Sequence, residues 1–158
     1  MKPPAIILLF FTWFTVSCTT DQPVVSDLTC EYLENPCGID IKNPRLSWKI
    51  HSDQNGQKQT AYHILVASSE KVLAENRGDL WNTEKTESGQ SVHTVYQGEK
   101  LDPRQQVFWK VRIWDRYGDP SPWSKTATWE MALNPSDWQA KWIGLDQYQK
   151  VKPEGMDP

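Results

Sequence analysis

The feature that most constrains the fold is an alternation of apolar and more polar side chains with a period of two. The alternation is clearest at 107–114, where Val107, Trp109, Val111 and Ile113 occupy every second position. Successive side chains of a strand point to opposite faces of a sheet, so this period predicts a strand with one buried face. An amphipathic helix would instead place apolar residues three and four positions apart. The chain is therefore expected to be built from sheets.

Further segments give the same strand signal and are separated by turn residues. Residues 61–67 are apolar on both faces, which predicts a central strand. Residues 68–78 change period, with serine at the start, good helix formers and a closing glycine, and so predict one or two helical turns. The pattern predicts an all-β immunoglobulin or fibronectin type III-like β-sandwich of about seven strands with one short helix. The expected strands are 28–33, 46–50, 61–67, 79–82, 91–96, 107–114 and 126–131.

The N-terminal residues read as an export signal, which is removed from the mature protein. Lys2 precedes an apolar run from Ala5 to Phe14, and this run is shorter than the ~20 residues of a membrane-spanning helix. Small Ser17 and then Cys18 follow, as in a bacterial lipoprotein signal, although Thr15 stands where leucine is usual. We expect a signal peptide at 1–17, lipidation of Cys18 and a polar tether at 18–27. Ordinary secretion without a lipid is the alternative.

These assignments predict an exported lipoprotein of the outer membrane or cell surface, facing the periplasm or the exterior. The lipid would be its only membrane anchor. Lys and Arg number 17 against 20 Asp and Glu, and both signs are scattered along the chain. With no basic excess to neutralise phosphates, nucleic acid is not an expected partner.

Besides Cys18, the exported part of the chain contains two cysteines. A disulfide between Cys30 and Cys37 stays open as a possibility, because an oxidising compartment allows it if the chain folds back. One buried thiol and one loop thiol is the commoner state, and we favour it. The thiols lack the paired spacing and clustered histidines of a metal site, so no metal and no cofactor are expected.

The titratable residues form no recognisable catalytic motif. Five carboxylates fall in or beside expected turns and are interpreted as solvated, and the three histidines are interpreted as strand-face residues. A catalytic carboxylate pair would need environments that separate two pKa values. We therefore expect no catalytic residue in this chain. The residues considered are Asp115, Asp119, Glu84, Glu87, Glu99, His51, His63 and His93.

The chain contains nine tryptophans, and they divide by their strand phase. Trp48, Trp109 and Trp129 share a phase with aliphatic residues and are expected in the core. Trp114 shares its phase with Lys110 and Arg112, which predicts a stacked cation–aromatic ladder on the outer face.

Sugar binding stays open for a few of these tryptophans. Trp123 is expected to fold onto the ladder, and Trp81, Trp114 and Trp123 could alternatively serve as sugar platforms. We favour structural stacking, because interleaved cations would cover the ring faces that a sugar needs. Trp138 and Trp142 follow the last strand and are expected to contact a neighbouring domain.

Several motifs together resemble a known family. Leu-Asp-Pro at 101–103, Trp109 to Arg112 and Ser-Pro-Trp-Ser at 121–124 resemble a fibronectin type III domain. The N-terminal module of bacterial α-L-rhamnosidases, glycoside hydrolase family 78-like, is more specifically similar in the order and spacing of its segments. Two residues depart from the patterns: Val107 replaces a corner tyrosine, and Cys37 replaces an aliphatic residue and is therefore expected to be packed. The rhamnosidase-like segments are 31–40, 44–48, 59–68, 78–81, 114–115 and 137–144.

The resemblance implies the fold of this chain and the presence of neighbouring domains, but no catalytic residue within the chain. The family hydrolyses terminal α-L-rhamnose with inversion, using two carboxylates ~6.5–9.5 Å apart in a downstream helical barrel. No residue of this chain matches those carboxylates, so we expect a fragment or a truncated gene whose partners are neighbouring rhamnosidase domains. The expected organisation is a sandwich at 28–133 and a linker into a second domain at 134–158. The alternative function is a carbohydrate-binding module that takes rhamnose-containing glycans on exposed tryptophans.

Overall fold

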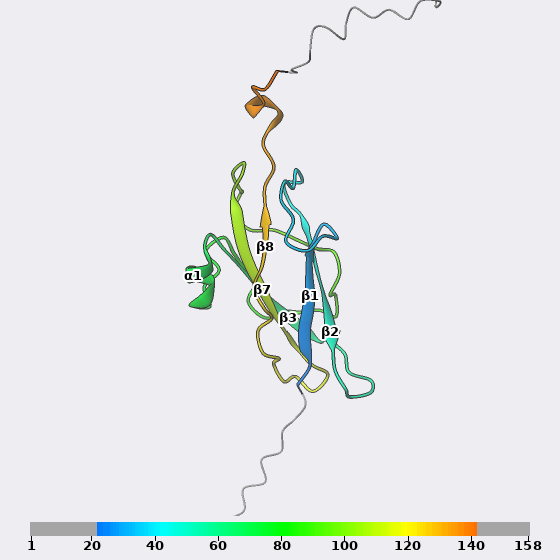
Figure 1. The fold of residues 1–158 in the computed structure, drawn as a ribbon. Coiled ribbons are helices and arrows are strands. Elements are labelled where there is room, and N and C mark those ends of the chain that lie inside the picture. Colours follow the sequence, from blue (N-terminus) through cyan, green and yellow to red (C-terminus); the bar gives the residue numbers. More distant parts are fainter. Residues whose placement is uncertain (1–21, 142–158) are drawn as a thin grey trace, which may run out of the picture.

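The computed structural model describes residues 22–141, which form two antiparallel sheets packed face to face (Figure 1). The smaller sheet has the order β1-β2-β6 and the larger one β4-β3-β7-β8, with β5 also paired to β3. The strands are β1 (Val24–Cys30), β2 (Arg45–His51), β3 (Ala61–Ala67), β4 (Trp81–Asn82), β5 (Thr86–Glu87), β6 (Thr94–Val95), β7 (Gln106–Trp114) and β8 (Ala127–Glu130). The helices are α1 (Glu70–Ala74) and a 3₁₀ turn, η1 (Pro135–Asp137).

The predicted sandwich, the central β3 and the long β7 are confirmed, while several boundaries differ. β1 begins at Val24, so residues 24–27 belong to the sandwich and not to the predicted tether at 18–27. It ends at Cys30, where a turn closed by hydrogen bonds between Cys30 and Leu33 replaces the end of the expected strand 28–33. The expected strand 91–96 is reduced to β6, and β5 was not predicted.

The core is dominated by tryptophans, as their strand phase predicts. Trp48, Trp109 and Trp129 are at most 2% exposed. Trp129 makes edge-to-face contacts with Trp109 and Tyr96, whose ring centroids lie 6.4 and 5.6 Å away. Tyr96 is itself in edge contact with Trp81 at 5.3 Å. Such contacts are worth about 0.5–1.5 kcal/mol each beyond area burial, so this aromatic chain ties β4, β7 and β8 together.

The one turn of helix between β3 and β4 packs on the outer face of the larger sheet. Ser69 caps α1 through its hydroxyl, which accepts a hydrogen bond from the Val72 N–H. Leu73 is buried against Leu65 and Ala67 of β3 in a second, smaller apolar cluster. The predicted helical turns are confirmed, and they place α1 beside β7.

Two turns are held by buried polar side chains. Asp115 is 5% exposed and accepts hydrogen bonds from the backbone N–H groups of Tyr117 and Asp119, so the solvated turn carboxylate expected there is wrong. Tyr96 donates its hydroxyl hydrogen to the Glu99 carbonyl oxygen at 2.8 Å, just before the Leu101 turn. Val107 is fully buried and cannot make such a bond, so Tyr96 ties down this corner instead.

The chain enters the sandwich at one end and leaves it at the opposite end. In Figure 1 the chain enters β1 at the bottom of the molecule and leaves β8 at the top. The segment after β8 carries η1 and Trp138, whose side chain is 68% exposed. The opposite placement of entry and exit fixes where neighbouring segments of the polypeptide join the domain.

Candidate functional site

The predicted cation–aromatic ladder is present on the outer face of the larger sheet. We use this name for Lys85, Trp114, Arg112, Trp123 and Lys110. The guanidinium carbon of Arg112 lies 5.1 Å from the Trp114 ring centroid and 4.7 Å from that of Trp123. Lys85 lies over Trp114 and Lys110 over Trp123, at 5.1 and 5.0 Å. Each indole of the ladder therefore has two cations against it.

His63 supports the ladder from β3 and is a strand-face histidine, as predicted. Its Nε2 lies 2.7 Å from Asn82 Oδ1, and its Nδ1 lies 3.5 Å from an Arg112 Nη2. Burial lowers the pKa of His63, although the Asn82 hydrogen bond opposes that effect. The neutral ring therefore donates through Nε2 to Asn82 and accepts at Nδ1 from Arg112. Trp123 covers the imidazole, with ring centroids 5.0 Å apart.

Lys110 joins the ladder to α1. It is 8% exposed, and its ammonium donates to the Leu73 carbonyl oxygen at 2.8 Å and to Asn76 Oδ1 at 2.7 Å. A cation at the carboxyl end of a helix satisfies carbonyl groups that lack partners within the helix. Burial and the charge of Arg112 lower the pKa of Lys110. The ladder thus fastens the helix and the Trp123 loop to the sheet.

The structure separates the other predicted site residues. Trp81 is half-buried and packs against the core and Tyr96, so it is not a free platform. Trp138 is exposed beyond the last strand, as expected. Trp142 and the predicted lipidation site Cys18 lie outside the described residues.

Within residues 22–141, the carboxyl groups with displaced pKa values are all shifted towards ionisation. The Lys49 hydrogen bond and charge lower the pKa of Asp27, and the Arg45 hydrogen bonds lower that of Glu31 despite its burial. For Asp115 burial acts in the opposite direction, but hydrogen bonds from backbone N–H groups outweigh it and the pKa is lowered. Burial likewise acts to raise the pKa of Asp79, but hydrogen bonds from the Ser68 hydroxyl and backbone N–H outweigh it, and the pKa is lowered. A glycosidase general acid needs a raised pKa, which none of these four groups has.

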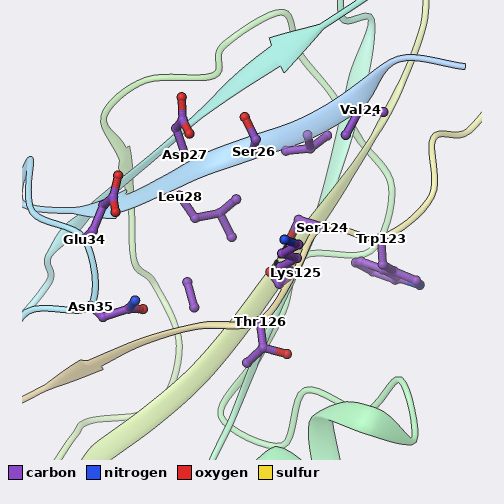
Figure 2. A pocket seen from close by; sticks show the side chains of 12 residues that line it. Val24, Ser26, Asp27, Leu28, Glu34, Asn35, Trp123, Ser124, Lys125 and Thr126 are labelled. Atoms are coloured by element: carbon purple, nitrogen blue, oxygen red, sulfur yellow. Dashed lines mark hydrogen bonds between the residues drawn. The ribbon is translucent and has the colours of Figure 1, made fainter.

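One open hollow of about 470 Å³ lies between β1 and the segment at 123–127 (Figure 2). Trp123 stands at its rim, and on the opposite side Asp27 belongs to β1 and Asn35 to the turn that follows β1. These polar groups already join strands: Asp27 pairs with Lys49 at 3.1 Å, and Asn35 Oδ1 accepts from the Thr128 N–H at 2.8 Å. We therefore interpret the hollow as the gap where the edges of the two sheets meet, and not as a ligand site.

The cysteines are free, as favoured. Cys30 is buried, which raises the pKa of its thiol to about 12. Cys37 is exposed in the turn, so the packed position expected from the resemblance is wrong. Within residues 22–141, no His, Cys, Asp and Glu side chains are grouped as a metal site would require. No helix in this range has the length and apolar character needed to cross a membrane.

Comparisons with known proteins agree with this architecture. A family model described as the Rha78A-like, N-terminal immunoglobulin domain matches residues 25–135. An α-L-rhamnosidase of Formosa agariphila is 40% identical over 155 residues, covering 95% of this chain and 16% of that protein.

Solved structures give the same result. The α-L-rhamnosidase from Dictyoglumus thermophilum superimposes with a TM-score of 0.72 and 44% identity, covering 78% of this chain and 14% of that one. The Streptomyces avermitilis α-L-rhamnosidase complexed with L-rhamnose gives a TM-score of 0.73 and 41% identity, covering 77% and 12%. The chain thus spans 12–16% of the length of these relatives. It belongs to the family of Rha78A-like N-terminal immunoglobulin domains.

Proposed function

We propose that the chain is a non-catalytic structural domain at the N-terminal side of an exported α-L-rhamnosidase. In this proposal the full-length protein hydrolyses terminal α-L-rhamnose, and its catalytic carboxylates come from segments beyond this domain. The domain would connect a lipid anchor at Cys18 to the rest of the enzyme and pack against its neighbours.

The observation that supports the structural role most strongly is that cations already cover the rings of the outer tryptophans. The Arg112 guanidinium lies over the rings of both Trp114 and Trp123, and lysines lie over the same two rings. A sugar stacks on an aromatic face, so these cations would have to be displaced before a sugar could bind. The ladder instead contributes about 0.5–1 kcal/mol per exposed cation–aromatic contact to the sheet.

The placement of the chain ends supports a connecting role. β1 begins at one end of the sandwich and β8 leads out at the other (Figure 1). The nine residues of β7 alone span roughly 30 Å at ~3.3 Å per residue. A domain built this way would hold a downstream catalytic part about one sandwich length from an anchor at Cys18.

Domain exchange in the Streptomyces avermitilis α-L-rhamnosidase tests this proposal. The N-terminal segment that this chain matches is either deleted or replaced by residues 22–141. We expect the deletion to lower the midpoint of thermal unfolding by several degrees and the replacement to restore most of that loss. Hydrolysis of an aryl α-L-rhamnoside should have the same kcat in the replaced and the parent enzyme, because the domain contributes no catalytic group.

The exchange has a clear contrary result. If the replaced enzyme melts no higher than the deletion, the domain does not stabilise its neighbours and the proposal is wrong. Where the deletion yields no soluble enzyme, recovery of soluble, active enzyme by the replacement is the corresponding readout.

A further inference from the structure

Residues beside the point where the chain leaves β8 line a second hollow of about 480 Å³. The chain leaves β8 at the top of the molecule in Figure 1. We call this second hollow the exit hollow; it is formed by the loops at 39–42 and 100–103 and by residues 131–135. Its apolar lining includes Ile39, Leu101 and Met131, which are 7–8% exposed and belong to the core. Leu133 also lines the hollow and is 39% exposed.

The rim of the exit hollow carries charges of both signs. Asp40, Lys42, Lys100 and Asp102 line it, and none of these side chains forms an ion pair with another residue in the described range. An apolar centre inside a polar rim is the usual anatomy of a protein interface. Two acids and two bases sum to zero, which fits a partner surface without a strong net charge.

The path of the chain leads away from β8 directly beside this hollow. Residues 131–135 form one wall, and the polypeptide continues from them through η1 and Trp138. The seven residues from Pro135 to Lys141 can reach at most ~25 Å when extended. A domain that follows this segment is tethered beside the hollow, so its effective concentration there is of the order of millimolar.

We infer that the exit hollow is the docking surface for the domain that follows this one in α-L-rhamnosidases. The following domain inserts an apolar side chain between Leu133 and Leu101 and meets the balanced charges of the rim. The relatives have more than four-fifths of their length outside the matched region, and the matching family model describes an N-terminal domain, which favours a following domain as the occupant. This inference rests on the proposed structural function and assigns its contact surface.

The domain exchange enzyme provides the test when Leu133 is changed. Leu133→Asp places a charge in the hollow, and Val92→Asp is the matched control, because Val92 is 56% exposed and lines neither hollow. In thermal unfolding we expect the replaced enzyme to lose its single cooperative transition with Leu133→Asp and to keep it with Val92→Asp. Leu133→Met, which keeps an apolar side chain, should also keep the single transition.

The outcomes separate this inference from the proposed function. In the 158-residue chain by itself, the Leu133→Asp and Val92→Asp variants should have the same melting midpoint. That result would show that Leu133→Asp does not prevent the domain from folding. If Leu133→Asp and Val92→Asp enzymes melt alike while the intact replacement is stabilising, the docking surface lies elsewhere and this inference is wrong. If the intact replacement itself gives no stabilisation, the proposed function fails, and this inference fails with it.

Discussion

Replacing Trp109 by alanine should lower the free energy of unfolding by about 3–5 kcal/mol. The side chain is fully buried on β7, opposite Val66 of β3, and in edge contact with Trp129. Alanine would leave a large cavity in the middle of the sandwich, and neighbours from both sheets cannot collapse into it without losing their own contacts. Since domains of this size are stable by only about 5–15 kcal/mol, the variant should be close to unfolding at 37 °C.

Urea denaturation followed by circular dichroism measures this effect, with Trp138→Ala as the control. Trp138 is 68% exposed, so its removal should change the unfolding free energy by less than ~0.5 kcal/mol. Equal losses in the two variants would contradict the assignment of Trp109 to the core.

Gly98→Ala is expected to cost about 3 kcal/mol, although it adds only one methyl group. A Cβ at this position would lie 2.6 Å from the Tyr96 hydroxyl and from the Trp81 Cβ, and closer still to the Leu80 carbonyl oxygen. Backbone and a core tyrosine surround the site, so no flexible side chain can move aside. The methyl group would separate β4 from the Tyr96 corner and break the hydroxyl bond to Glu99.

Gly89→Ala is the matched control for this effect. A Cβ there meets only the Gln59 carbonyl oxygen at 3.5 Å, which is an ordinary contact. Alanine should therefore be neutral or stabilise by up to about 1 kcal/mol through the unfolded state. The thermal midpoints of the two variants should differ by more than ~10 °C, and midpoints within a few degrees of each other would show that Gly98 is not closely surrounded.

The sequence predicts most of what depends on periodicity. The phase of Trp109 against Trp114 along β7 separates a core tryptophan from a ladder tryptophan, because alternate residues face opposite sides of a sheet. The same phase places Lys110 and Arg112 beside Trp114, and the structure confirms their contacts with the indoles. Long strands with strict alternation therefore gave correct faces as well as correct positions.

Features that depend on partners distant in sequence were missed. β5 has two residues and exists only because it pairs with Ala61 and Tyr62, which no local pattern signals. Asp115 is buried because the turn at 115–119 folds its N–H groups back onto the carboxylate, and Gln57, 58 positions earlier, donates to it as well. Leu101, interpreted from sequence only as part of a turn motif, also lines the exit hollow, and no residue-level signal marks that role.

Titration with L-rhamnose tests most directly whether these tryptophans serve the fold and not a ligand. The full chain is titrated with L-rhamnose and methyl α-L-rhamnoside while tryptophan emission is recorded, with D-glucose as the control sugar. We expect no saturable change with any of the sugars, because Arg112 and the two lysines already lie over the outer indoles. A saturable change that is specific for rhamnose and disappears in Trp114→Ala or Trp123→Ala would contradict the structural account and establish a carbohydrate-binding module.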